Sequence, residues 1–267
     1  MPTDADCSPP CDQPITHPTF RFLLRTSTAY ISNTMSDTPT LTWSTHEREY
    51  SRFQDRFLKR SLRPTEYKLD FRGQPYVPIA NEARLENEAA CLRFIKDVTN
   101  IPVPEVLAAY EKDGSFFLWT EICHGIPMKE LSVTDQAVVI KELEGHLRTL
   151  QTLRSNRIGG PTGIICPPPR VSSHFPKDKV WPSISSSDNE FVFCHDDLSQ
   201  FNVIVDKDTL TISGIIDWEF AGYYPSYFES PFYRSSKPSG AQVKDLPDTL
   251  KLISFFAVRF PTNCLCG

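Results

Sequence analysis

Two stretches decide the fold of this chain: His195-Asp196-Asp197-Leu198-Ser199-Gln200-Phe201-Asn202 and Ile215-Ile216-Asp217-Trp218-Glu219. Asp197 and Asn202 lie five residues apart, and Asp217 follows Asn202 by fifteen residues. This spacing is typical of phosphoryl-transfer sites, where one carboxylate orients a hydroxyl nucleophile while an amide and a second carboxylate hold magnesium on the ATP phosphates. We therefore interpret Asp197 as catalytic, Asn202 and Asp217 as metal ligands, and Glu219 as a candidate ligand of a second ion.

The sequence between these groups predicts a β-hairpin. Residues 202–205 alternate and are β-branched, 206–208 have the Asp-rich composition of a turn, and 211–216 form a second apolar run. Antiparallel pairing brings Asn202 and Asp217 side by side, within reach of one metal ion. His195 belongs to the same catalytic loop, where we expect it to hold the loop by hydrogen bonding; a direct chemical role is the alternative.

These residues resemble the signature of the aminoglycoside phosphotransferase family, also called the phosphotransferase enzyme family. More narrowly, Phe193 to Pro225 is similar to the fungal branch of that family, and the resemblance extends from about Phe57 to about Phe232. It implies an α+β fold with the two lobes of a protein kinase: a small antiparallel-sheet lobe with one helix, and a larger, mainly helical lobe carrying the catalytic hairpin. It also implies ATP as phosphoryl donor, Mg²⁺ as cofactor and a small-molecule hydroxyl as acceptor.

The small lobe is expected to contain strands over residues 53–63 and 67–77, then a helix capped by Asn81 and running to about Thr99. Glu88 shares the apolar face of that helix, and a buried carboxylate is costly unless a cation meets it. Kinase-like folds use such a glutamate to hold a strand lysine against the ATP phosphates. Lys59 is the candidate partner, whereas Arg60 faces the opposite side of the strand.

An apolar strand over residues 116–122 predicts the last strand of the small lobe and the hinge that follows it. Backbone groups from Glu121 to Cys123 are expected to bind adenine, so the predicted nucleotide-binding residues are Lys59, Glu88, Glu121 and Cys123. Ser132-Val133-Thr134-Asp135 then predicts a capped helix start, and the apolar periodicity beyond it indicates the core helix of the larger lobe.

Composition limits the classes of partner. The 267 residues carry a net charge of −5, which gives no basic field for nucleic acid, and no apolar run is long enough to suggest a membrane span. Eight cysteines without a C-x-x-C pair favour a reducing, cytoplasmic setting. The oligomeric state leaves no signal in the sequence.

Three segments are expected along the chain. Residues 1–45 are predicted as a disordered extension because they are rich in Pro, Ser, Thr and Asp; 46–122 form the small nucleotide-binding lobe and 123–267 the catalytic lobe. The chain stops 42 residues after Pro225, which suggests a truncated acceptor region.

Two departures keep an alternative open. The first glycine is Gly73, after Lys59, so no glycine-rich loop precedes the lysine strand, and Asp196 stands where the broader family commonly has glycine. An active small-molecule kinase is the favoured interpretation, and a non-catalytic, kinase-like binding protein is the alternative. A metal-dependent hydrolase using Asp197 and Asp217 is a weaker third class, against which the Lys59–Glu88 pair argues.

Overall fold

The structure is a computed structural model, and it describes residues 38–236 and 248–258. The chain divides between Met35 and Ser36, and every described residue belongs to the second unit. Most of the predicted N-terminal extension, residues 1–37, therefore lies outside the described residues, as do 237–247 and 259–267.

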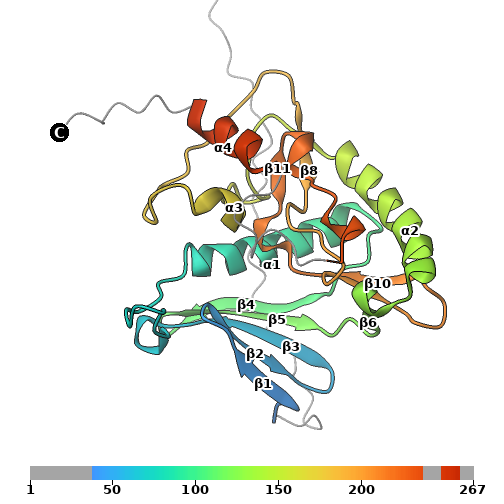
Figure 1. The fold of residues 1–267 in the computed structure, drawn as a ribbon, viewed down its shortest axis with the longest axis horizontal. Helices are drawn as coiled ribbons and strands as arrows, with labels where there is room; N and C mark the ends of the chain where they lie inside the picture. The colour runs from blue at the N-terminus through green and yellow to red at the C-terminus, as the bar shows by residue number, and fades with distance from the viewer. Residues whose placement is uncertain (1–37, 237–247, 259–267) are drawn as a thin grey trace, which may run out of the picture. The chain divides into compact units, whose positions relative to one another are not determined.

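A five-stranded antiparallel sheet forms the small lobe, in the order β1-β2-β3-β5-β4. Its strands are β1 (Leu41–Ser44), β2 (Arg48–Arg52), β3 (Arg56–Ser61), β4 (Val106–Lys112) and β5 (Ser115–Glu121). Helix α1 (Asn81–Val98) packs on β4 and β5 and lies between the sheet and the larger lobe (Figure 1). The helix is held from both sides because its buried residues, Leu85 and Leu92 among them, meet apolar groups of both lobes.

Three predictions in this lobe were wrong in detail. Residues 67–77 do not form a strand, because the Asp70 carboxylate accepts the amides of Arg72 and Gln74 and turns the chain back on itself. Strand β1 lies inside the segment predicted as extension, so the lobe begins before residue 46. Asn81 does not cap α1: it is the first helical residue, and its side chain accepts from Arg48 Nε and donates to the Glu47 carbonyl.

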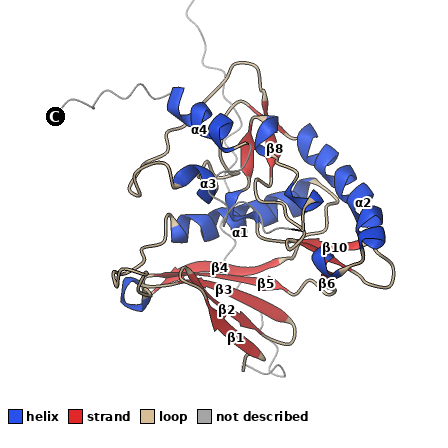
Figure 2. Cartoon of the chain, in the orientation of Figure 1, coloured by secondary structure: helices blue, strands red, loops and turns tan. Residues whose placement is uncertain are grey.

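The larger lobe combines α2 (Val133–Thr152) with two three-stranded sheets, β10-β9-β6 and β11-β8-β7. The strands are β6 (Ile126–Pro127), β7 (Arg154–Ser155), β8 (Phe191–Cys194), β9 (Val203–Val205), β10 (Ile212–Ile215) and β11 (Gly222–Tyr224). Helices α3 (Pro169–Ser172) and α4 (Thr249–Val258) also belong to the larger lobe. Its short 3-10 helices are η2 (Met128–Glu130), η3 (Trp218–Phe220), η4 (Ser226–Phe228) and η5 (Phe232–Arg234), whereas η1 (Pro64–Glu66) lies in the small lobe. Figure 2 shows the long strands gathered in the small lobe and most of the helix in the larger one.

The predicted α+β class with two lobes is confirmed by this element order. The cap of α2 is confirmed as well, since the Ser132 hydroxyl accepts the Asp135 amide at 3.2 Å. Within the described ranges, no helix combines the length and the apolar character needed to cross a bilayer.

A continuous core anchors the hairpin formed by β9 and β10. Trp218 and Phe193 are buried with the inward faces of α1, α2, β9 and β10 in one hydrophobic cluster. The hairpin turn is built as expected, because Asp206 Oδ1 accepts the amides of Asp208 and Thr209 at 2.9 Å each. Polar groups at the ends of this hairpin therefore project from a packed frame rather than from a loose loop.

Candidate active site

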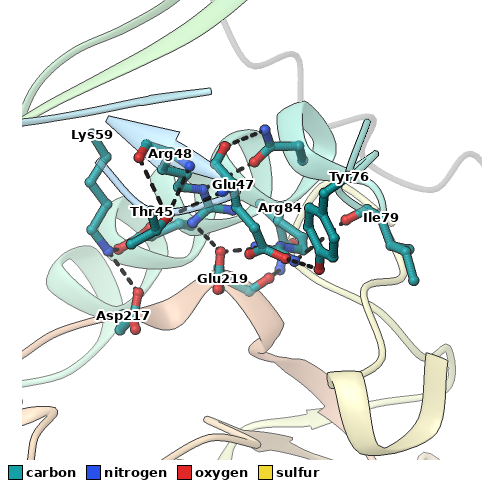
Figure 3. A network of polar contacts seen from close by, with 12 residues as sticks. Thr45, Glu47, Arg48, Lys59, Tyr76, Ile79, Arg84, Asp217 and Glu219 are labelled. Carbon is teal, nitrogen blue, oxygen red and sulfur yellow. Dashed lines mark hydrogen bonds and ion pairs between the residues drawn. The ribbon is translucent and has the colours of Figure 1, made fainter. Parts of the chain in front are cut away.

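Lys59 lies at the centre of the site. It sits on β3 directly opposite Tyr50 on β2 and Leu118 on β5. Its Nζ donates to Asp217 Oδ1 at 2.7 Å (Figure 3). The same Nζ donates to Glu88 Oε1 at 2.6 Å, so one ammonium bridges helix α1 and the end of the hairpin. The predicted Lys59–Glu88 ion pair is confirmed.

The neighbouring Arg60 faces the other side of the sheet, as the alternation of a strand requires. Its guanidinium bonds Glu66 at 2.7 Å and pairs with Glu49 at 3.2 Å. The strand register on which the choice of Lys59 depends is therefore correct.

The two charges of the Lys59–Asp217 pair stabilise each other. Burial favours loss of the proton from Lys59, but the Asp217 and Glu88 carboxylates outweigh it and raise the pKa of the lysine overall. Burial likewise opposes the charge on Asp217, but Lys59 outweighs it and lowers the pKa of this carboxyl to about 2. Both groups are charged at neutral pH.

Asn202 and Asp217 lie beside each other at the open ends of the hairpin. The amide of Ile216 donates to the Asn202 carbonyl at 3.0 Å, which fixes the two chain ends as neighbours. Asn202 Nδ2 donates to the Asp197 carbonyl at 2.8 Å, and because a carbonyl only accepts, the side-chain oxygen of Asn202 is turned away from that contact. Asp217 adopts a left-handed conformation with φ 71°, which places its carboxylate beside Lys59 instead of continuing the strand.

Glu219, a predicted metal ligand, has two arginine partners. Its Oε2 forms an ion pair with Arg48 Nη1 of β2 and lies 3.3 Å from Arg84 Nε of α1 (Figure 3). The carboxyl oxygens of Glu88, Asp217 and Glu219 come within 4.8 Å of one another, but three cations already neutralise this group: Lys59, Arg48 and Arg84. Glu219, in the larger lobe, thus links that lobe to β2 and α1 of the small lobe through its ion pairs.

This arginine network was missed from the sequence. Arg84 also pairs with Glu47 Oε2 at 2.5 Å, and Tyr76 donates to Glu47 at 3.2 Å, so the network reaches the loop before α1. Arg84 stands four residues before Glu88, on the helix face predicted to be buried, and this spacing was the available signal. Nothing local marks Arg48, whose partner comes 171 positions later in the chain.

His195 holds the loop of residues 195–202 by hydrogen bonding, as expected. Its Nε2 lies 3.0 Å from the Ile216 carbonyl and its Nδ1 lies 3.4 Å from the Asp197 amide. A carbonyl only accepts and an amide only donates, so the ring is the neutral tautomer with its proton on Nε2. Burial lowers the pKa of His195 to about 4, which keeps it neutral. The loop positions Asp197, which is 6% exposed.

Two further side chains, Arg170 and Glu229, hold this loop by hydrogen bonds. The backbone of Asp196 is left-handed, with φ 64°. Its side chain accepts from Arg170 Nη2 at 2.7 Å, and Arg170 Nη1 donates to the Asp196 carbonyl at 3.0 Å. Both side chains of this pair are 0% exposed. Arg170 Nε also reaches Asp248, just before α4, at 3.2 Å. Glu229 accepts the His195 amide at 2.5 Å, and burial raises the pKa of Glu229 to about 7.

A cavity of about 150 Å³ lies beside Lys59. All four residues predicted to bind the nucleotide line it: Lys59, Glu88, Glu121 and Cys123. Phe57 of β3 lies in its wall, and Ile204 and Ile216 of the hairpin contribute from the larger lobe. Burial raises the pKa of Cys123 to about 11, so its thiol is a neutral wall group.

Glycines let the hinge approach the hairpin closely. A side chain at Gly214 would meet the sulfur of Cys123 at 2.2 Å, and one at Gly125 would meet the Val205 carbonyl oxygen at 2.3 Å. Gly125 also has φ 132°, a conformation that favours glycine. The hinge and the hairpin are therefore held close together, and both contribute residues to the cavity wall, Cys123 from the hinge and Ile204 from the hairpin.

Comparison with known proteins shows that part of the chain is similar to a known family. Residues 170–229 match the family model described as "Phosphotransferase enzyme family". The family resemblance is confirmed for this segment. It contains Arg170, the catalytic loop, the hairpin and η3, so the phosphotransferase signature coincides with the residues gathered around Asp197 and Asp217. No curated protein matches the chain.

Several solved structures are similar to the chain. Aminoglycoside phosphotransferase APH(3'')-Id from Streptomyces rimosus is 21% identical over 70% of this chain and 73% of its own, with a TM-score of 0.48. Aminoglycoside phosphotransferase APH(4)-Ia is 15% identical over 72% and 71%, with a TM-score of 0.47. A GDP complex of an aminoglycoside 2'-phosphotransferase IIIa mutant is 13% identical over 83% and 82%, with a TM-score of 0.46.

Proposed function

We propose that this protein is an ATP- and Mg²⁺-dependent phosphotransferase that transfers the γ-phosphoryl group to a hydroxyl of a small molecule. The observation that carries the proposal is the contact of one lysine, Lys59, with both Glu88 and Asp217 at the wall of a hinge-lined cavity. Phosphoryl-transfer sites need a cation held in place for the phosphates and a carboxylate beside it for the metal.

The nucleotide would lie with its adenine between Phe57 and the hairpin isoleucines, with backbone groups of Glu121 to Cys123 at its edge. Its phosphates would then extend toward Lys59. Breaking the Lys59–Asp217 contact costs the protein little when a phosphate takes the place of the carboxylate, because the lysine keeps its pairing with Glu88.

Asn202 and Asp217 fit a magnesium ion. Both offer hard oxygen ligands, the Asn202 amide nitrogen is turned to a carbonyl so that its oxygen is available, and the Asp217 side chain is 35% exposed. When bound, the ion would neutralise charge on the β- and γ-phosphates. Glu219 is left out of this site because two arginines already neutralise it.

Asp197 would orient the acceptor. The new P–O bond forms to the acceptor hydroxyl oxygen as the bond to the ADP oxygen breaks, and the hydroxyl proton passes to the Asp197 carboxylate. The products are ADP and a phosphate monoester. Because the transition state is loose, Asp197 contributes mainly by positioning and by accepting the proton late. His195 serves this step through Asp197, whose backbone it fixes.

The experiment has two stages. Calorimetric titration of the protein with ATP, with and without Mg²⁺, tests nucleotide binding, and Asp217→Ala should remove the magnesium dependence. A screen of small alcohols, sugars and amino alcohols for phosphorylated product, with Asp197→Asn as control, tests the chemistry. Magnesium-dependent binding without any product favours the alternative, a non-catalytic kinase-like binding protein; absence of ATP binding rejects both.

A further inference from the structure

Strand β2 presents a polar row to the cleft. Arg48, Tyr50 and Arg52 alternate along the strand and therefore share one face. Arg48 reaches Glu219 and Arg52 lines the cavity, so this is the face that looks into the site. Tyr50 stands between them and is the direct cross-strand partner of Lys59.

The ring of Tyr50 is fixed by its neighbours. It stacks on Trp43 with a centroid distance of 5.1 Å and an interplanar angle of 12°, and it lies 6.2 Å from Phe57, which lines the cavity. An aromatic ring held on two sides has one orientation for its hydroxyl, so little conformational entropy is lost when that hydroxyl binds a ligand.

The hydroxyl lies among the charges of the site. Burial raises the pKa of Tyr50, and the charges of Arg48, Asp217, Lys59 and Glu219 all act on it. Among the described residues, no hydrogen bond to this hydroxyl is formed, although Tyr76 and Tyr233 both use theirs. The half-buried hydroxyl of Tyr50, beside Lys59, is therefore available to donate a hydrogen bond to a ligand.

The turn between β1 and β2 offers few donors of its own. The Thr45 hydroxyl accepts the Glu47 amide at 3.2 Å and the Arg48 amide at 3.1 Å, and the Thr45 amide donates to the Arg48 carbonyl at 2.8 Å. Phosphate-binding loops leave such amides free to point at the anion. Here the turn has no glycine and three of its amides already have partners.

We propose that the Tyr50 hydroxyl donates a hydrogen bond to a phosphate oxygen of the bound nucleoside triphosphate, beside Lys59, in place of the missing glycine-rich loop. The inference rests on the proposed function for its ligand. It assigns to β2 a side-chain donor where the turn before it offers few free backbone donors, and it makes phosphate recognition a property of the β2–β3 pair.

The test is Tyr50→Phe, which removes one oxygen and keeps the aromatic stack. We expect the Kd for MgATP to rise roughly 10- to 100-fold, the range of one hydrogen bond to a charged group, while the Kd for adenosine stays unchanged. Tyr110→Phe is the matched control, because Tyr110 also stacks on a neighbouring ring, at 5.3 Å from Phe117, but is partly exposed on β4. Unchanged melting temperatures would show that both variants fold.

Three results would overturn the inference. If wild type binds MgATP and Tyr50→Phe binds it equally well, the hydroxyl does not contact the phosphates, although the proposed function stands. If ATP and adenosine weaken together, Tyr50 acts through the aromatic stack instead. If wild type binds no ATP, the inference fails together with the proposed function.

Discussion

Two regions of this protein that bury charge are built differently. Around Lys59, three cations of the small lobe meet four carboxylates, and two of these, Asp217 and Glu47, keep side chains 35% and 30% exposed. Beneath the catalytic loop, Arg170 is the cation bonded to Asp196, and that pair is closed to solvent. One region opens on a cavity, whereas in the other both side chains of the pair, Arg170 of α3 and Asp196, are closed to solvent.

This difference separates two uses of buried charge. An open network could exchange a protein partner for a ligand: in the proposed function, Lys59 would turn from Asp217 toward a phosphate and keep its pairing with Glu88. A sealed pair has no such exchange, because breaking it leaves a charge in a dry interior. We therefore expect substitutions in the open region to change ligand binding, together with stability where a buried partner such as Glu88 loses its cation, and substitutions in the sealed region to change stability alone.

The largest expected effect is at the border of the two regions. Asp197→Asn should lower the rate of phosphoryl transfer roughly 10²- to 10⁴-fold, because a positioned base is lost, while the Kd for MgATP stays the same. The rate is measured with an acceptor from the screen. Asp206→Asn, in the exposed hairpin turn, is the control and should keep full activity. Full activity of Asp197→Asn would show that another group orients the acceptor.

Next comes Lys59→Met, which breaks the open network. ATP affinity should be lost, and unfolding free energy should fall by about 3 to 5 kcal/mol because Glu88 is left buried without its cation. Urea unfolding and ATP titration measure the two effects.

Arg60→Met is the matched control for Lys59→Met, since Arg60 is adjacent but pairs with the partly exposed Glu49 and Glu66. It should bind ATP normally and lose less stability. The opposite ranking of the two variants would mean that the phosphate-binding cation is assigned to the wrong side of β3.

The sealed pair gives the third prediction. Asp196→Gly relieves the left-handed backbone at φ 64° but removes a partner of buried Arg170, so we expect a loss of about 3 kcal/mol in unfolding free energy. Arg170→Met should cost a similar amount, and the double variant should lose clearly less than the sum, because the two side chains are coupled. Additive losses in urea unfolding would refute the coupling.

The smallest expected effect is a pH dependence in the sealed region. The pKa of Glu229 is raised from 4.5 to about 7, so its contribution to stability is complete below pH 4.5 and lost as the pH rises through 7. The pKa of His195 is lowered from 6.5 to about 4, so its contribution is complete above pH 6.5 and lost as the pH falls through 4. Between pH 4.5 and pH 6.5, Glu229 therefore makes the unfolding free energy fall with rising pH, whereas His195 makes it rise.

Glu229→Gln would leave the His195 slope uncompensated. Relative to wild type, unfolding free energy of the variant should rise with pH by roughly 1 kcal/mol per pH unit between pH 4.5 and 6.5. Urea unfolding at several pH values measures this difference. Parallel pH profiles for the two proteins would mean that Glu229 titrates normally in the folded state.

Local patterns explain what could be predicted. The hairpin follows from alternation and turn composition within 16 residues, α1 from its apolar periodicity, and the Lys59–Glu88 pair from a carboxylate on a buried helix face. The first strand and the reversal at Asp70 were misjudged, since short segments with mixed composition satisfy both strand and turn patterns until their hydrogen-bond partners are known.

By itself, the sequence determined the neighbourhood of Asn202 and Asp217, because it depends on residues close in the chain, and the α+β class followed from the family resemblance that the same residues carry. Only the tertiary structure decided that Tyr50 lies opposite Lys59. It also decided the partners of the remaining charges: Arg48 and Arg84 for Glu219, and Arg170 for Asp196. Such pairs join segments far apart in sequence, and a buried charge is satisfied by whichever opposite charge the packing of the core brings to it.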